Sequence, residues 1–163
     1  MLKLTPVVQS RAFCGPASLK MVLGYYGIHT SEEKLARLSG ASRKRGTTAE
    51  GLLRAAHALR FQGFLKDHAT IGDLRVYVQR RKIPVIVDWF SGTEGHYSPV
   101  VDVRENVIRL QDPDIGRVRT LDLATFQRIW FDFPGNAIWS PRNLILRRMI
   151  VMHPKGWSVI KGR

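Results

Sequence analysis

The feature that most constrains the fold is a change of residue pattern at Pro84. Before it, capping residues at Thr30, Thr47 and Thr70 each precede apolar residues at helical spacing, which predicts three helices. After it, short apolar runs rich in β-branched residues are separated by turns, which predicts strands. Helices followed by strands favour an α+β architecture, with a helical layer packed on an antiparallel sheet.

The predicted elements can be given as ranges. Besides a first helix that begins near Pro16, the expected helices cover residues 31–38, 48–60, 70–78 and 123–131. The expected strands cover residues 4–8 at a sheet edge, 61–65, 85–90, 96–103, 107–111, 117–121 and 144–152.

Length and composition limit the class of protein. A chain of 163 residues is long enough for one domain with a substantial core, so we expect residues 1–163 to form a single domain. One cysteine excludes an internal disulfide framework and is typical of a reducing compartment, which predicts a cytoplasmic location. We expect neither a signal peptide nor a transmembrane segment, because no apolar run is long enough.

The net charge of +13 indicates an acidic partner, such as nucleic acid, an anionic membrane surface or an acidic peptide. The basic residues, however, form short clusters in separate segments: 43–45, 80–82 and 147–148. No zinc-finger spacing, RNP-type strand or basic zipper accompanies them. This pattern favours a basic, solvated surface, and nucleic-acid binding stays open as an alternative.

The single cysteine, Cys14, stands at the start of the first predicted helix. Pro16 suits the first helical turn, and Gly27 suits the left-handed stop that follows Tyr26. The unpaired N–H groups and the dipole at a helix start favour an anionic thiolate, which makes Cys14 a candidate nucleophile. The alternative is a buried cysteine that only fills apolar space.

A thiol nucleophile needs a base, and the base needs an acceptor that orients it. Of five histidines, His96 alone follows a flexible glycine-containing loop and opens a predicted strand. In a hairpin that turns at Glu105-Asn106, Asp112 comes near His96 and can accept its ring N–H. Other possible acceptors are Asp114, Asp102 and Asp88.

The segment before the cysteine contains a candidate for a fourth role. Gln9 offers amide donors, which together with the backbone N–H of Cys14 could stabilise an oxyanion. The alternative for Gln9 is an ordinary loop residue.

Several local sequences resemble the bacteriocin-processing peptidases, family thirty-nine of the papain-like cysteine peptidases. They follow one another in the family's order: Cys14-Gly15-Pro16-Ala17-Ser18-Leu19 through Tyr25-Tyr26-Gly27, Gly46-Thr47-Thr48-Ala49-Glu50-Gly51, Pro84-Val85-Ile86-Val87, Gly95-His96-Tyr97-Ser98-Pro99 and Asp112-Pro113. The similarity covers residues 4–132, and leaves 136–163 as a basic C-terminal extension. Family members cut leader peptides after a double glycine, often as the first domain of an export transporter.

The resemblance implies a papain-like fold and a role for each candidate residue. Cys14 would be the nucleophile, His96 the general base, Asp112 its orienting acceptor, and Gln9 part of the oxyanion hole. The substrate would be a peptide or protein, cut through a thioester without a metal or other cofactor. Because this chain carries no transporter segments, a partner transporter would be a separate protein.

The spacing of Gln9 and Cys14 departs from the family. Gln9 precedes Cys14 by five positions, where the family usually has a spacing of six. A catalytically silent, peptide-binding member of the family is therefore a second hypothesis.

Overall fold

The fold is built on a six-stranded, wholly antiparallel sheet with strand order β1-β8-β2-β3-β4-β5. It is seen in a computed structural model that describes residues 1–157. The strands are β1 (Phe61–Lys66), β2 (Val85–Ser91), β3 (Glu94–Val103), β4 (Val107–Asp112), β5 (Arg117–Asp122) and β8 (Met149–Pro154). A small second sheet pairs β6 (Phe131–Asp132) with β7 (Ile145–Leu146).

The helices begin at or one residue after the predicted caps, since Thr70 caps its helix as expected and Ser31 and Thr48 take the roles expected of Thr30 and Thr47. Ser31, Thr48 and Thr70 each accept a backbone N–H from the first turn of the following helix, and Thr70 forms a full capping box with Asp73. The helices are α1 (Cys14–Tyr25), α2 (Glu32–Ser39), α3 (Ala49–Ala58), α4 (Ile71–Arg75) and α5 (Leu123–Ile129). A π-helical turn, Val76–Arg80, extends α4, and a 3-10 turn covers Pro141–Asn143.

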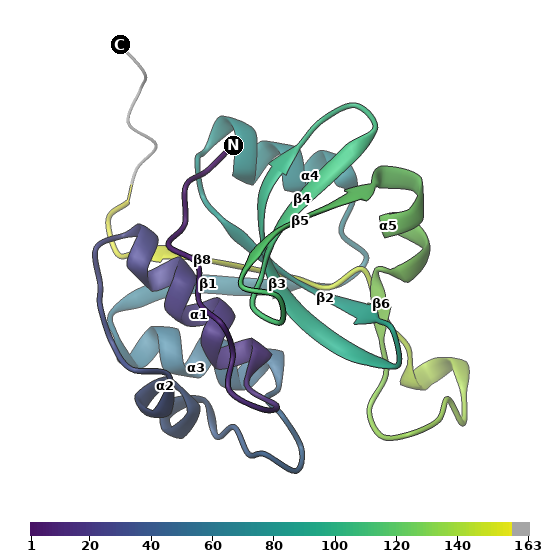
Figure 1. The fold of residues 1–163 in the computed structure, drawn as a ribbon, viewed down its shortest axis with the longest axis horizontal. Coiled ribbons are helices and arrows are strands. Elements are labelled where there is room, and N and C mark those ends of the chain that lie inside the picture. The colour runs from purple at the N-terminus through teal and green to yellow at the C-terminus, as the bar shows by residue number, and fades with distance from the viewer. Residues whose placement is uncertain (158–163) are drawn as a thin grey trace.

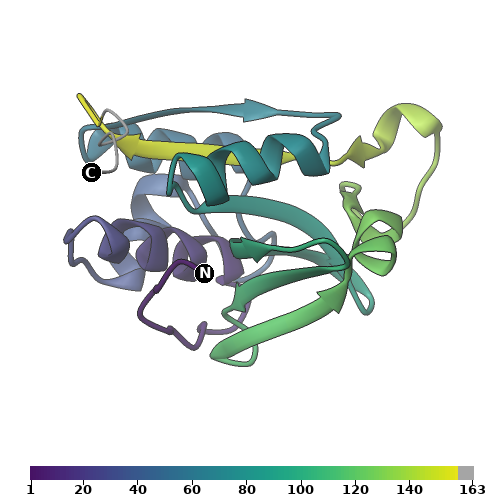
Figure 2. The same cartoon turned by 90° about the horizontal axis from the view of Figure 1, so that it is seen from above.

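The central strands are apolar on both faces because helices cover both faces. On β2, Val85 and Val87 pack with side chains of α4 and α5, whereas Ile86 packs with α1, α2 and α3 on the opposite face. Figures 1 and 2 show α1–α3 grouped on one side of the sheet, with β1 and β5 at its two edges. The prediction of an α+β fold with helices packed on an antiparallel sheet is confirmed. The helix after Thr70 lies on the other face from α1–α3, which the sequence did not indicate.

Three predicted elements differ from the structure. Residues 4–8 form no strand, because Pro6 lacks an N–H and the segment is tied down only near its ends, at Leu2 and Gln9. The helix predicted over 123–131 ends at Ile129, and Phe131 already belongs to β6. The strand predicted over 144–152 is divided into β7 and β8.

The segment expected as a C-terminal extension contributes a central strand. β8 lies between β1 and β2, and Met149, Ile150, Val151 and Met152 are fully buried. Residues 133–144 project from the sheet as a lobe, visible beyond β6 at one side of both ribbon views (Figures 1 and 2). The last part of that predicted extension, 158–163, lies outside the described residues. Among the helices of residues 1–157, none has the length and hydropathy needed to span a bilayer.

Candidate active site

The thiol of Cys14 lies at the first residue of α1, where a tight turn delivers the chain. The N–H of Phe13 bonds to the carbonyl of Ser10, and Ala12 has φ of 65°, a left-handed conformation that is costly for alanine. The Ser10 N–H is in turn held by the buried carboxylate of Glu32 at 3.0 Å. No acidic side chain occupies the first turn of α1, so the positive end of its dipole faces the half-buried thiol without a competing negative charge.

The imidazole of His96 lies near the start of β3 and is only 6% exposed. Its Nε2 lies 2.8 Å from Oδ1 of Asp112, and the side chain of Cys14 is close enough to the ring to raise the pKa of His96. The edge of the ring meets Trp89, its partner on β2, with centroids 5.6 Å apart. The indole N–H of Trp89 bonds to Ser98, so the wall behind the imidazole is itself anchored.

Asp112 is the last residue of β4 and is fully buried. The β3–β4 pairing shifts register by one residue between Val100 and Asp102, which alters the alignment expected from a simple hairpin. The Asp112 carboxylate also accepts the backbone N–H of Asp114 at 2.9 Å. The structure therefore brings Cys14, His96 and Asp112 together, with His96 hydrogen-bonded to Asp112 and next to Cys14.

None of the other possible acceptors hydrogen-bonds His96 within residues 1–157. Asp102 pairs with Arg104 and Arg109, and Asp114 contributes its N–H to Asp112. Asp88 pairs across the strands with Tyr97, whereas His96 pairs with Trp89, so the pleat directs Asp88 to the other face.

The charged groups around His96 favour its protonated form, the imidazolium. Burial lowers the pKa of His96, but the hydrogen bonds to Asp112 and Cys14 and their negative charges outweigh burial and raise that pKa to about 9. For Asp112, burial raises the pKa, but hydrogen bonds from His96, Arg119 and the Asp114 amide lower it to about 2. At neutral pH the two side chains form a buried ion pair.

Arg119 completes this group, and the sequence analysis did not identify it. Its Nε donates to Oδ2 of Asp112 at 2.5 Å, and its guanidinium lies over the ring of Trp89, 5.9 Å from the centroid. Asp112 pairs directly with Arg117, and Arg119 stands two residues further on the same face of β5, within diagonal reach. That signal becomes usable only when the strand register is known.

Gln9 lies in the loop before α1. Its N–H bonds to the carbonyl of Pro113 at 2.9 Å, which ties this loop to the turn after Asp112. The side-chain Oε1 is buried and accepts no hydrogen bond from the described residues. The loop that carries Gln9 is thus held beside the turn after Asp112. Within the described residues, the Gln9 amide forms no hydrogen bond with Cys14.

Two neighbouring carboxyl groups, those of buried Asp88 and half-buried Asp132, lie beside the strand that carries His96. A methyl group added to Gly95 would meet the Asp132 carboxylate at 2.2 Å, so Asp132 rests directly on this strand. Burial and the charge of Asp132 raise the pKa of Asp88 well above its usual range, and burial raises the pKa of Asp132 as well. The pair therefore holds a proton more strongly than two separate carboxylates would.

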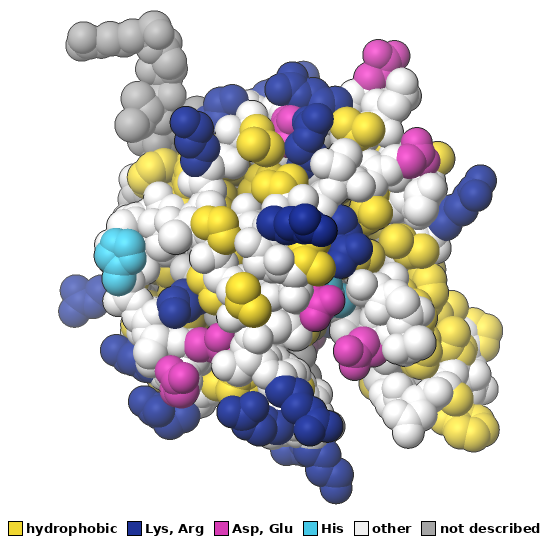
Figure 3. Space-filling view, viewed as in Figure 1, with side chains coloured by type: hydrophobic (Ala, Val, Ile, Leu, Met, Phe, Trp, Pro, Cys, Tyr) yellow, Lys and Arg dark blue, Asp and Glu magenta, His cyan; other side chains and the backbone are white. Residues whose placement is uncertain are grey.

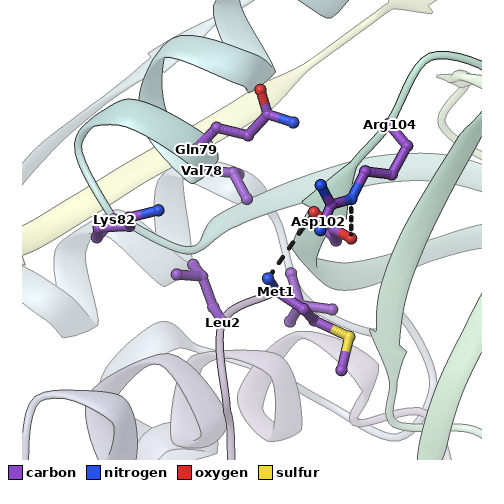
Figure 4. Close-up of a pocket in the computed structure, with 8 residues that line it drawn as sticks. Met1, Leu2, Val78, Gln79, Lys82, Asp102 and Arg104 are labelled. Atoms are coloured by element: carbon purple, nitrogen blue, oxygen red, sulfur yellow. Dashed lines mark hydrogen bonds and ion pairs between the residues drawn. The ribbon is translucent and has the colours of Figure 1, made fainter.

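Figure 3 shows a notch between the lobe and the rest of the molecule, with Lys and Arg side chains gathered beside it over the α2–α3 connection. A separate cavity of about 370 Å³ lies near the start of the chain (Figure 4). Leu2, Val78 and Asp102 are among its lining residues, and none of the three candidate residues contributes to it. Within residues 1–157, no three His, Cys, Asp or Glu side chains are grouped so as to hold a metal ion.

The fold and the site define a papain-like α+β protein with a thiol at a helix start and a histidine on the facing sheet. The sequence profile of the Peptidase C39 family matches residues 6–134, and the chain belongs to this family. The family resemblance seen in the sequence is confirmed.

Relatives and solved structures agree. An uncharacterized protein of Methanothermobacter thermautotrophicus is 36% identical over 135 residues, which is 81% of this chain and 84% of that protein. The pediocin PA-1 transport/processing ATP-binding protein PedD of Pediococcus acidilactici is 36% identical over 62% of this chain, but this match spans only 14% of PedD.

Among solved structures, the peptidase domain of Streptococcus ComA, a bi-functional ABC transporter, superposes with a TM-score of 0.71 at 27% identity. That match covers 94% of this chain and 99% of the ComA domain. A double-glycine motif protease from an AMS/PCAT transporter, solved with its leader peptide, has a TM-score of 0.70 at 21% identity. The match covers 94% of this chain and 93% of that one, and it supports the fold alone.

Proposed function

We propose that this protein is a cysteine peptidase that hydrolyses a peptide bond through Cys14, His96 and Asp112. The observation that carries the proposal is the His96 imidazole, which hydrogen-bonds a buried carboxylate and lies next to the Cys14 thiol. Family membership supports the same chemistry.

Each residue has a step in this reaction. The sulfur of Cys14 attacks the substrate carbonyl, and a C–S bond forms as the carbonyl oxygen becomes an oxyanion. His96 then donates its proton to the leaving amine, the C–N bond breaks, and a thioester remains. Water attacks the thioester while His96 takes a proton from it, and the acid product leaves with the thiol restored. Asp112 keeps the imidazole oriented and stabilises its charged form whenever His96 carries the proton.

The oxyanion requires donors at the start of α1. The backbone N–H of Cys14 has no acceptor within the helix, because it belongs to the first turn. We assign the second donor to the Gln9 amide, whose loop is tied to Pro113 beside the site.

The substrate class follows from the relatives. Since the sequence resembles peptidases that cut after a double glycine, and a similar protein is named as a transport/processing protein, we propose a peptide with a double-glycine cleavage site as substrate. We further propose that residues 1–163 act as one peptidase domain in the cytoplasm. The single cysteine fits a reducing compartment.

Cleavage of synthetic double-glycine peptides, followed by mass spectrometry, tests this proposal. Cys14→Ala should abolish product while the circular dichroism spectrum stays unchanged. His96→Ala should slow turnover by about 10²- to 10⁴-fold. Asp112→Asn should have a smaller effect than His96→Ala, because an amide oxygen still accepts the ring N–H. Turnover by the Cys14→Ala variant at the wild-type rate would exclude Cys14 as nucleophile.

One observation favours a different function. The short spacing of Gln9 and Cys14, together with a Gln9 Oε1 that accepts no hydrogen bond from residues 1–157, suits a member of the family that binds peptides without cutting them. In that case the protein would retain peptides in a binding assay and yield no product at any pH.

A further inference from the structure

The turn between α2 and α3 carries three cationic side chains on a backbone that is held by hydrogen bonds. Ser42 and Gly46 exchange two backbone hydrogen bonds of 2.9 and 2.8 Å, and the Ser42 hydroxyl accepts the N–H of Arg45. Arg43, Lys44 and Arg45 form the tip of this turn, and all three are exposed. We call residues 42–46 the basic turn.

The basic turn lies directly against the segment that delivers the thiol. The guanidinium of Arg43 stacks over the ring of Phe13, the residue before Cys14, at 5.1 Å from the centroid. A methyl group on Gly15 would meet Thr47 at 3.1 Å, so the chain leaving the turn packs closely on the first turn of α1. The basic turn therefore packs, through Arg43 and Thr47, against the start of α1, where the proposed nucleophile lies.

The positive charge of the turn is not neutralised within the described residues. None of its three cations forms an ion pair with a carboxylate of residues 1–157. Of the acidic side chains of the two flanking helices, Glu32 binds the Ser10 N–H and Glu50 pairs with Arg148, whereas Glu33 lies in the first turn of α2, at the end of that helix remote from the basic turn. A free cationic cluster beside a reactive centre attracts anionic groups to it.

The wall across the notch has a different character. Phe131 and Phe133 stack on Phe90, with centroids 5.2 and 5.4 Å apart, and they fix the lobe to the end of β2. Further out on the lobe, Ile138 and Trp139 are 48% and 87% exposed. Figure 3 shows apolar side chains over this lobe and cationic ones over the opposite side of the notch.

We infer that the notch selects peptide substrates that carry acidic side chains on the side facing the basic turn. This inference rests on the proposed peptidase function and specifies its substrate. A nucleic acid would find phosphate-binding cations on only one wall, whereas a peptide can present carboxylates to the turn and apolar side chains to the lobe.

The experiment compares two double-glycine peptides that differ only by Glu or Gln at the residues flanking the cleavage site. The wild-type protein should cleave the Glu peptide with a kcat/KM about three-fold higher for each carboxylate that reaches the turn, and the preference should shrink in high salt. The triple variant Arg43→Gln/Lys44→Gln/Arg45→Gln should lose the preference, so that its kcat/KM values for the Glu and Gln peptides become equal.

A matched control removes the same charge elsewhere. Arg80→Gln/Arg81→Gln/Lys82→Gln alters an equally basic, exposed triplet that follows α4, and it should keep the preference for the Glu peptide. Equal kcat/KM for the two peptides, or a preference retained by the variant at the turn, would overturn the inference.

Binding separates this inference from the proposed function. Fluorescence anisotropy with the Cys14→Ala variant measures the affinity for labelled Glu and Gln peptides without turnover. Selective binding of the Glu peptide by a protein that never cleaves would support charge selection and refute the peptidase. If the turn variant instead weakens salt-sensitive retention on DNA and leaves peptide affinities equal, the basic turn binds nucleic acid, and the inference is wrong.

Discussion

Protonation of His96 is the property on which the proposed chemistry depends, and it can be measured directly. A pKa of about 9, against an ordinary value of 6.5, corresponds to about 3 kcal/mol in favour of the imidazolium. The favourable part comes from Asp112 at 2.8 Å and from Cys14. Asp112→Asn keeps an acceptor at the same place but removes its charge. An opposite charge at this range is worth about 1 to 3 pKa units, so the variant should titrate near about pH 7.

The assay is NMR of protein labelled with ¹³C at the histidine Cε1, titrated from pH 5 to 10. Five histidines give five signals, and the His96→Gln variant assigns the one that matters. His29, His57 and His68 are exposed and serve as references in the same spectra. A wild-type midpoint near 6.5, or a midpoint that Asp112→Asn leaves unchanged, would refute the electrostatic reasoning.

The same ionisation has a signature in stability. Because the folded pKa of His96 is raised, its stabilisation is fully present below the unfolded pKa of about 6.5 and is lost as pH rises through about 9. Urea unfolding at pH 6 and at pH 9.5 should therefore show the wild type losing up to about 3 kcal/mol relative to His96→Gln. An advantage that does not change over this interval would contradict the linkage.

Three further predictions concern the surroundings of the site. Arg119→Met removes the guanidinium from Asp112, so the carboxyl pKa should rise and the acid limb of the cleavage profile should move to higher pH; an unmoved limb would exclude Arg119 from this role. Gly95→Ala forces a methyl group onto the Asp132 carboxylate and should cost about 1–3 kcal/mol in urea unfolding, most of it recovered in the double variant with Asp132→Ala. Ile150→Ala opens a cavity in the buried strand β8 and should cost about 2–5 kcal/mol by the same measurement, whereas a loss below 1 kcal/mol would place this strand outside the core.

Local chemistry made most elements predictable. The helix starts at Ser31, Thr48 and Thr70 could be identified to within one residue, because a capping side chain accepts a backbone N–H only three residues further along. The position of Cys14 at a helix start followed in the same way from Pro16. The strands after Pro84 followed from β-branched runs, which pack well only on a pleated surface.

Long-range order was not predictable from such signals. The edge strand expected at residues 4–8 does not form, and β8 enters the middle of the sheet, because pairing partners far apart in sequence leave no local mark. The neighbourhood of His96 and Asp112 could be inferred from a hairpin. The register shift between Val100 and Asp102 could not, and without that register Arg119 cannot be matched to its carboxylate.

The proposed chemistry and the proposed selection of substrates lie on different kinds of structural element. The proposed chemistry lies on regular elements, since Cys14 begins a helix and His96 and Asp112 belong to paired strands. The two walls of the notch lie on connections, namely the basic turn 42–46 and the lobe 133–144. Connections tolerate substitution and insertion because few buried contacts depend on them. Substitutions in the two walls can therefore change substrate preference while Cys14, His96 and Asp112 keep their arrangement. In this chain the two walls are a basic turn and an apolar lobe.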